Sequence, residues 1–461
     1  MAGSERGCPE LQGSQLLWTH EACSWTAKSA DYRALQELAY VNHAGVPVES
    51  IYVLMTAFPL VLMAHQSCGP LGTPAPPLAK ALWDTVVVVL PLTFHFSAHL
   101  EQPLLLLLLA TSILELRRCS KGGLSWQATF SLDNDRLRFV SEYRALVMMS
   151  TCVAILAVDF SSVFSRAQAK TEEFGYSLMD VGTGSIIFSS GVCTMPKRGG
   201  ASRLYKIMKL WPVLLIGFVR AALMWGIDYH VPPGEYGIHW NFFFTIAVIS
   251  LVSTATDLSA LASATAASLA LGAYQFYLSW LGGANFVLHA ERLGLFTANR
   301  EGILSSAGYL SLHWFGVAVG STLRNSGALR CVLQLFLLAA AGYFVNLTLS
   351  FAGLEASRRM CNLPYVLFTV SLNAWVLALL GSVDLLAGRP RTAMSLSVAG
   401  VQDSMLPVFL FANLLTGAVN LLLQPLMVPF WPAMAVMFGY CLLWSVPAAM
   451  LRMKKKKLKF W

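Results

Sequence analysis

Charged residues are scarce in this chain of 461 residues. Asp, Glu, Lys and Arg together make up 12% of it, about half of their usual share in a soluble domain, whereas hydrophobic residues make up 56%. Long uncharged runs such as QPLLLLLLATSIL recur, and a bilayer core takes about 20 apolar residues per helix. The composition excludes an ordinary soluble domain and predicts a protein that crosses the membrane several times.

The sequence also lacks the usual signs of metal binding, disulfides and a cleaved leader. Its nine cysteines show no C-x-x-C spacing, which argues against both a zinc site and a disulfide framework. His95 and His99 stand four apart, but no third ligand is evident, so we predict no metal and no cofactor. The stretch before Ala34 holds no apolar segment of signal-peptide type. The formal charge of +8 does not argue for nucleic acid, because in membrane proteins the placement of Lys and Arg matters more than their sum.

Hydropathy predicts an all-α fold, a polytopic membrane helical bundle of about 13 transmembrane helices. The predicted helices cover residues 50–66, 80–97, 102–116, 143–160, 177–196, 204–227, 240–256, 259–281, 302–323, 330–350, 363–387, 404–424 and 428–451. No internal repeat is evident. We therefore predict a luminal N-terminal lead over 1–48, a membrane bundle over 49–451 and a basic cytosolic tail over 452–461.

Basic residues in the loops predict the orientation. One set of alternate loops is rich in them: Arg117, Arg118, Lys121, Arg136, Arg138, Lys197, Arg198, Arg203, Arg324, Arg389 and Arg391. In the other set, DYHVPPGEYGIHW and LQPLMVPFWP have none. The prediction is a luminal N-terminus and a cytosolic tail, with Arg358 and Arg359 as a basic pair on the wrong side.

The tail carries a second signal. Lys457 and Lys459 occupy the fifth and third positions from the C-terminus, which resembles the dilysine retrieval signal of endoplasmic reticulum membrane proteins. The alternative is an electrostatic anchor to anionic lipid, worth about 1 kcal/mol per lysine.

Ionisable groups beside apolar spans are candidates for function, because lipid tolerates them poorly. The stretch DFSSVFSRAQAKTEEFGYSLMD places Asp159, Arg166, Lys170 and Asp180 between two apolar segments. It is short enough to fold back as a re-entrant or interfacial segment. The alternative is a solvated loop that carries charges of both signs.

Three further stretches place polar groups at the starts of predicted helices. EYGIHWNFFFT holds His239 and Asn241, where an interfacial anchor is the alternative to chemistry. FTANREGILSSAGY and SRRMCNLPYVLF place Arg and Asn side chains where helix N-termini and bidentate Arg contacts favour phosphate. Simple helix capping is the alternative there. The residues of these two stretches are Asn299, Arg300, Glu301, Arg358, Arg359 and Asn362.

Together these stretches resemble the glycosylphosphatidylinositol (GPI) inositol acyltransferase family. The resemblance rests on AVDF with AKTEEFGYSLMDVGTGSIIFSSG, and on EYGIHWNFFFT, ANREGILSSAGY and SRRMCNLPYV, in that order. It covers nearly the whole chain after the N-terminal lead. The chain departs from the family pattern, Asp-Phe, two residues, Phe-Pro-Arg-Arg-Phe-Ala-Lys, because DFSSVFSRAQAK is one residue longer, lacks the Pro and has Ala167 in place of an Arg.

The resemblance implies an acyltransferase of GPI-anchor biosynthesis in the endoplasmic reticulum membrane. It would move a long-chain acyl group, typically palmitoyl, from acyl-CoA to the inositol hydroxyl of glucosaminyl-phosphatidylinositol. Its partners would be those two substrates and the bilayer, with no nucleic acid and no obligate protein partner.

The family pattern matches Asp159 and Lys170, and we predict Asp159 as the base that accepts the hydroxyl proton and Lys170 as the group that orients it or stabilises developing charge. His239 is the reserve base. The arginines suit phosphate. The predicted substrate-binding residues are Arg166, Asp180, Asn241, Asn299, Arg300, Glu301, Arg358, Arg359 and Asn362.

Two other classes of function compete. A lipid or solute transporter also has intramembrane charges and Gly-broken helices, but such proteins commonly show two related halves, which this chain lacks. A scaffold subunit would not need clustered acid, base and amide groups. Acylation of phosphatidylinositol-glucosamine by purified protein separates the three.

Overall fold

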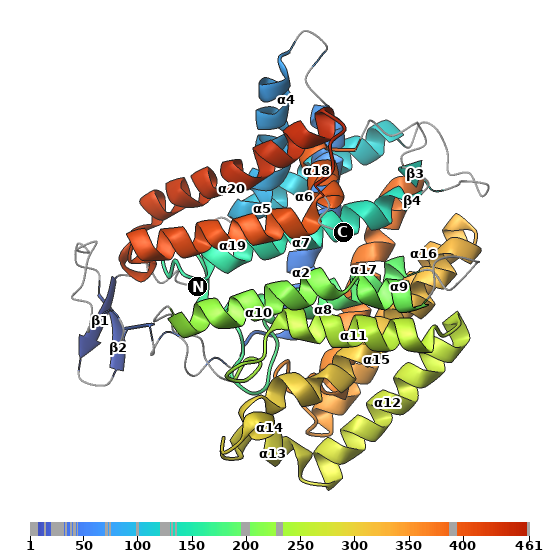
Figure 1. Ribbon diagram of the computed structural model, residues 1–461. Helices are drawn as coiled ribbons and strands as arrows, with labels where there is room; N and C mark the ends of the chain where they lie inside the picture. Colours follow the sequence, from blue (N-terminus) through green and yellow to red (C-terminus); the bar gives the residue numbers. More distant parts are fainter. Residues whose placement is uncertain are drawn as a thin grey trace. The chain divides into compact units, whose positions relative to one another are not determined.

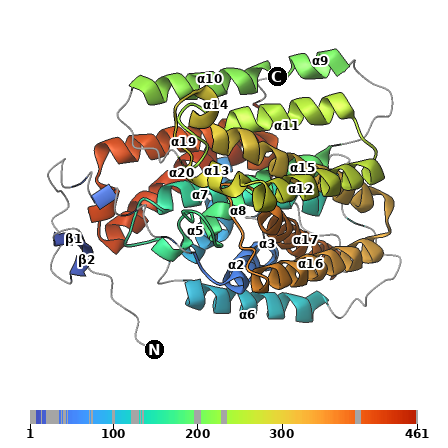
Figure 2. The ribbon, with the colours of Figure 1, turned by 90° about the horizontal axis from the view of Figure 1, so that it is seen from below.

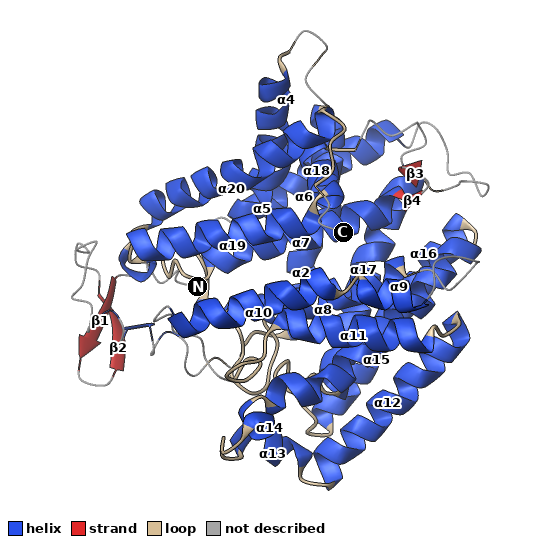
Figure 3. Cartoon of the chain, viewed as in Figure 1, coloured by secondary structure: helices blue, strands red, loops and turns tan. Residues whose placement is uncertain are grey.

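The computed structural model describes residues 8–12, 15–19, 32, 35–36, 39, 43, 45–69, 72, 75–97, 101–119, 130, 132–133, 136–194, 203–226, 234–386 and 394–458 (Figure 1). Helices dominate these residues (Figure 3), which confirms the all-α class. The strands within them form two short antiparallel hairpins. These pair β1 (Cys8–Gln12) with β2 (Gln15–Thr19), and β3 (Leu132–Asp133) with β4 (Arg136–Leu137).

Eight helices of the described chain are long and apolar enough to cross a membrane, which confirms a polytopic membrane protein. They are Val48–Cys68, Pro77–His95, Arg138–Ala157, Arg300–Asn325, Ala328–Phe351, Leu363–Leu385, Met405–Leu422 and Phe430–Met453. Four of the other predicted spans are shorter apolar helices: Glu101–Leu114, Leu178–Cys193, Trp211–Leu223 and Phe242–Thr256. The last, α12 (Ala260–Trp280), has 21 residues but is rich in Ala and Ser. The count of thirteen therefore stays a prediction.

The chain forms two compact units. Unit 1 comprises Met1–Lys170, Ser177–Met179 and Val376–Lys459, and unit 2 comprises Thr171–Tyr176, Asp180–Trp375 and Phe460–Trp461. The predicted division into lead, bundle and tail rests on the sequence alone.

The core of unit 1 is built on α7 (Arg138–Ala157). This helix packs against α18 (Leu396–Asp403) and α19 (Met405–Leu422), and α18 packs against α20 (Phe430–Met453). A buried polar tie adds to this apolar packing. The carboxylate of Asp84, in α4 (Pro77–Asp84), lies 2.9 Å from His65 Nε2 and accepts a hydrogen bond of 2.7 Å from the backbone N–H of Ser397. Asp84 thus satisfies an N–H in the first turn of α18, where Ser397 is fully buried.

In unit 2, α15 (Arg300–Asn325) packs against α12 and α11 (Phe242–Thr256), and α10 (Trp211–Gly226) packs against α11. Figures 1 and 2 both place α12 beside α15. Glycines allow α15 to approach α8 (Leu178–Cys193) backbone to backbone. A Cβ on Gly191 would lie 2.1 Å from the carbonyl oxygen of His313, and one on Gly316 would lie 2.4 Å from that of Phe188. This close packing fixes the middle of α15, and the start of the same helix carries Arg300 and Glu301.

Candidate functional site

The first polar stretch leaves α7 at Ala157 as a series of turns with one short 3-10 helix, Arg166–Gln168. It is pinned to the connection between α19 and α20. Ser161 donates a hydrogen bond of 2.9 Å to the carbonyl oxygen of Leu426, and Ser162 donates one of 2.8 Å to that of Val428. The Ser hydroxyls thus hold an irregular backbone in place directly after Asp159.

Asp159 is the acid at the end of α7. It is partly buried, and its Oδ2 accepts a hydrogen bond of 2.8 Å from the Asn420 amide in α19. Burial raises the pKa of Asp159 to about 6, against the lowering effects of the Asn420 hydrogen bond and of the positive charges of Arg166 and Lys170. Arg166 also donates to the carbonyl oxygen of Val158. The result is a carboxyl group with a pKa near neutrality, the range in which a general base works best.

The second and third stretches form one structure, because the loop at residues 234–240 lies on the start of α15. Asn299 Oδ1 accepts hydrogen bonds from the backbone N–H groups of His239 (2.8 Å) and Trp240 (2.9 Å). The N–H of Gly302 donates to the carbonyl oxygen of Tyr236 at 3.0 Å. Asn299 therefore joins two segments and does not cap α15 through its side chain. The His239 side chain is exposed, while its backbone is held.

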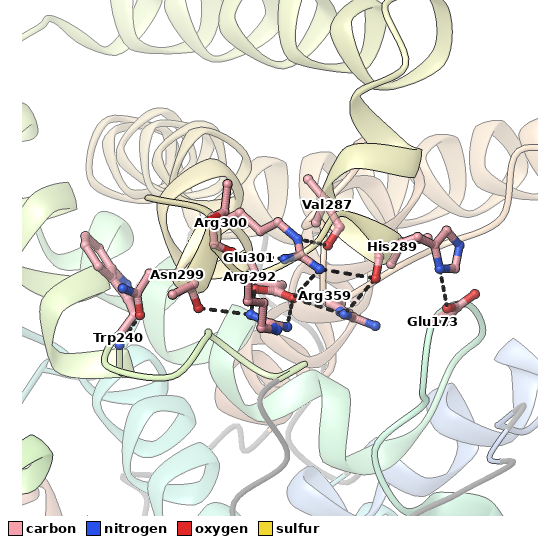
Figure 4. Close-up of polar contacts among 12 residues, drawn as sticks. Glu173, Trp240, Val287, His289, Arg292, Asn299, Arg300, Glu301 and Arg359 are labelled. Atoms are coloured by element: carbon pink, nitrogen blue, oxygen red, sulfur yellow. Dashed lines mark hydrogen bonds and ion pairs between the residues drawn. The ribbon is translucent and has the colours of Figure 1, made fainter. Parts of the chain in front are cut away.

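Three arginines surround the buried carboxylate of Glu301, and we call this set the Glu301 cluster (Figure 4). Nitrogen–oxygen distances to Glu301 are 2.5 Å from Arg292, 3.0 Å from Arg359 and 3.8 Å from Arg300. Arg300 also donates to the carbonyl oxygens of Val287 and Thr297, at 2.8 and 3.0 Å. Three positive charges face one negative charge, so the cluster is cationic and suits an anionic ligand.

A second buried ion pair joins the first and fourth stretches. Arg358 Nε donates to Asp180 Oδ1 at 2.7 Å, and the other carboxylate oxygen accepts from the Thr171 hydroxyl, also at 2.7 Å. The Tyr365 hydroxyl donates to the backbone carbonyl of Asp180 at 2.7 Å. Burial acts to lower the pKa of Arg358, but the Asp180 carboxylate outweighs it, and the net shift of that pKa is upward. Arg358 is therefore a permanent cation inside unit 2.

The two remaining predicted residues organise the backbone. Asn241 Oδ1 accepts from the N–H of Phe243 at 3.0 Å and caps α11, while its Nδ2 donates to the carbonyl oxygen of Gly217. Asn362 Oδ1 accepts from the N–H of Ser357 at 3.0 Å, and its Nδ2 donates to the carbonyl oxygen of Glu355. Both amides have protein partners on both sides, and their predicted substrate contacts stay a prediction.

The structure thus places the predicted charged residues in three polar centres and uses the predicted amides to hold the backbone. Asp159, Arg166 and Lys170 belong to unit 1, and the other nine belong to unit 2. Sequence reasoning missed four participants, which are Thr171, Arg292, Tyr365 and Asn420. Asn420 had a usable signal, an amide inside an apolar span. Arg292 had none, because it lies in a loop and reaches Glu301 only through the fold.

These features define a class: a polytopic helical membrane protein with buried acids, bases and amides gathered at the ends of its helices. Residues 32–451 match the GWT1 family. An uncharacterized protein of Arabidopsis thaliana is 32% identical, over 82% of this chain and 88% of its own length. The "Phosphatidylinositol-glycan biosynthesis class W protein" of Dictyostelium discoideum is 29% identical, over 73% of this chain and 78% of its own.

A third relative, the "GPI-anchored wall transfer protein 1" of Yarrowia lipolytica, is 31% identical over 70% of this chain and 73% of its own length. The chain belongs to the GWT1 family, the family of GPI inositol acyltransferases. The resemblance carried by the four stretches is confirmed.

Proposed function

We propose that this protein transfers a long-chain acyl group, typically palmitoyl, from acyl-CoA to the inositol hydroxyl of glucosaminyl-phosphatidylinositol, in the endoplasmic reticulum membrane. The observation that carries the proposal is Asp159, a partly buried carboxyl with a pKa of about 6, held by Asn420 beside two cations. Membership of a family whose named relatives belong to GPI-anchor biosynthesis supports the same reaction.

In the proposed reaction, Asp159 accepts the proton of the inositol hydroxyl while that oxygen attacks the thioester carbonyl. A C–O bond forms, and the carbonyl oxygen carries negative charge that nearby cations stabilise. Lys170 serves in that role, and Arg166 suits substrate phosphate. When the C–S bond breaks, the proton on Asp159 passes to the leaving thiolate, which restores the carboxylate and releases free CoA.

A second group of cations also suits the phosphates of the substrates. The Glu301 cluster has an excess of positive charge, and Arg359 and Arg292 reach its surface more than Arg300 does. We assign it to phosphate for this reason. No cofactor takes part in the proposed reaction, because a positioned base and cations suffice for acyl transfer from a thioester.

Replacement of Asp159 and Lys170 tests the proposal. Asp159→Asn keeps the shape of the side chain and removes the base, so acyl transfer should fall by at least about 100-fold. Lys170→Met keeps the apolar stem and should also cripple turnover. If the two residues act as one unit, the double variant should be little worse than either single variant. The assay is acyl transfer by purified protein.

The matched control is Asp257→Asn, the same chemical change at the left-handed C-cap of α11, where Asn is well tolerated. It should keep wild-type turnover, and all variants are compared at equal thermal stability. Near-normal turnover of Asp159→Asn together with collapse of His239→Ala would contradict the assignment and make His239 the base.

A further inference from the structure

The guanidinium group of Arg358 is only partly used by the protein. Its side chain is 5% exposed, and Nε is bonded to Asp180. Among the described residues, neither Nη1 nor Nη2 has a hydrogen-bond partner. Arginine offers five N–H donors, and the ion pair with Asp180 uses only the one on Nε. Such a group is expected to be kept for an acceptor that comes from outside the protein.

A second unmatched group lies in the same region of unit 2. The hydroxyl of Tyr309 is buried and has no hydrogen-bond partner in the part of the chain that the structure describes. The Tyr309 ring lies edge-on to that of Tyr365, with 6.4 Å between centroids. The Tyr365 hydroxyl in turn donates a hydrogen bond to the backbone carbonyl of Asp180. Tyr309 is also among the electrostatic partners of Arg358. The unmatched hydroxyl and the unmatched guanidinium nitrogens therefore belong to one polar centre.

The charge of this centre differs from that of the Glu301 cluster. Arg358 is neutralised by Asp180, and Glu235 is a further negative partner. The adjacent Arg359 instead joins two more arginines around one glutamate. An anion is favoured at the Glu301 cluster and gains little beside Arg358. Two arginines that are neighbours in the sequence thus face different ligand chemistry.

We infer that Arg358 and Tyr309 bind uncharged hydroxyl oxygens of a polyol headgroup, as carried by the inositol and sugar rings of a GPI precursor. The inference rests on the proposed function for the identity of that lipid. A hydroxyl group can accept from a guanidinium N–H and donate to the Tyr309 oxygen at once. A thioester carbonyl can only accept, and a phosphate would need the excess of positive charge that this centre lacks.

Tyr309→Phe tests the inference, because it removes one oxygen and leaves the ring. Since that oxygen has no protein partner, the melting temperature of the free protein should stay the same or rise. The KM for the precursor lipid should rise about tenfold, the effect of one lost hydrogen bond, while the KM for acyl-CoA stays unchanged. Unchanged KM values for both substrates, or a rise for acyl-CoA alone, would overturn it.

Tyr274→Phe is the matched control. The Tyr274 hydroxyl is also buried in unit 2, but it donates to the carbonyl oxygen of Met360 at 2.8 Å. Its removal should lower the melting temperature and leave both KM values as they are. The reverse pattern, in which Tyr309→Phe destabilises and Tyr274→Phe changes the precursor KM, would make Tyr309 a structural residue.

A binding measurement separates this inference from the proposed function. If wild-type protein transfers no acyl group, the proposed function fails, and the melting temperature with and without glucosaminyl-phosphatidylinositol decides the inference. The lipid should raise the melting temperature of wild-type protein and raise that of Tyr309→Phe less. Equal shifts would overturn it.

Discussion

The surroundings of Asp159 suit the role of base that we propose for it. Burial raises its pKa to about 6, and the Asn420 hydrogen bond and two cations keep it from rising further. A carboxyl group with an ordinary pKa would be ionised at neutral pH but would be a weak base. A general base must be both ionised and sufficiently basic at the working pH. With a pKa of about 6, Asp159 is mostly ionised at pH 7 and more basic than a free aspartate.

The dependence of acyl transfer on pH should report this pKa. Below the pKa the carboxyl is protonated and cannot accept a proton, so activity is expected to rise with pH through about 6. Between pH 5 and pH 7 the ionised fraction grows about tenfold, and kcat/KM should follow it. Rates measured across this range, with protein stability checked at each pH, decide the matter.

Asn420→Ala sharpens this test, because the Asn420 hydrogen bond lowers the pKa of Asp159. Its loss should move the half-maximal pH upward, while a residue that only packs α19 against α7 would lower activity equally at every pH. A profile with no inflection between pH 5 and pH 7 in the wild-type protein would argue against Asp159 as the base.

The residues of the site were predictable one by one, but their partners were not. Charges next to apolar spans pointed to Asp159, Asp180 and Arg358 because lipid tolerates them poorly. The Asp180–Arg358 pair joins positions 178 residues apart, and the Asp159–Asn420 pair joins positions 261 apart. No local pattern in the sequence predicts these pairings, because they depend on how the helices pack.

At the scale of the elements, hydropathy located the helices because every backbone polar group within a bilayer must be satisfied internally. It could not show how the helices end. The polar stretch after α7 forms turns held by Ser161 and Ser162, and the chain of α2 (Val48–Met55) and α3 (Ala57–Cys68) is interrupted at Thr56. The turns depend on hydrogen bonds to distant backbone groups, whereas Thr56 bonds to carbonyl oxygens one turn earlier in its own helix.

Gly302 shows why two of the sequence stretches belong together. A Cβ at this position would lie 2.2 Å from the Trp240 ring and 2.6 Å from the carbonyl oxygen of Tyr236, closer than any real contact. Gly302→Ala should therefore displace the loop at residues 234–240 from the start of α15 and disturb the Glu301 cluster. We expect a loss of 1–3 kcal/mol, about the cost of overpacking, and a rise in KM for a phosphate-bearing substrate.

The control for this variant is Gly272→Ala in α12, where an added Cβ meets nothing within 4 Å. Ala is the better helix former, so Gly272→Ala should be neutral or slightly stabilising. Thermal unfolding and acyl-transfer kinetics of both variants make the comparison. Wild-type behaviour of Gly302→Ala would mean that the loop does not hold the cluster.

At the scale of the whole molecule, the first polar stretch contributes to both compact units. Asp159–Lys170 belongs to unit 1 with the proposed base, and Thr171–Tyr176 and Asp180 belong to unit 2 with the Arg358 and Glu301 centres. This division follows the chemistry of the proposal, because proton transfer falls to one unit and headgroup recognition to the other. The sequence presented this stretch as a single motif and gave no sign of the boundary.

In the C-terminal tail, a lysine of the predicted retrieval signal forms an ion pair with the protein itself. Lys457 Nζ lies 2.9 Å from Asp403 Oδ1, and Arg452 Nη1 donates to the same carboxylate at 2.8 Å. Burial acts to raise the pKa of Asp403, but these two hydrogen bonds outweigh it and lower that pKa. One of the two lysines of the predicted retrieval signal is thus bound to the protein itself, in competition with any receptor.

Replacement of Lys457 and Lys459 by Ser should let part of the protein leave the endoplasmic reticulum, because a cytosolic retrieval receptor would lose both charges. Asp403→Asn is the informative companion. It breaks the Lys457–Asp403 ion pair but keeps both lysines, so it should leave retention intact or strengthen it. Imaging of tagged protein against compartment markers measures both, with the tag at the N-terminus to keep the tail free.

If the lysine variant stays in place, the tail only attracts anionic lipid. If the Asp403→Asn variant also leaves the endoplasmic reticulum, the ion pair is needed to stabilise the helical bundle, and the changed location reflects a loss of stability.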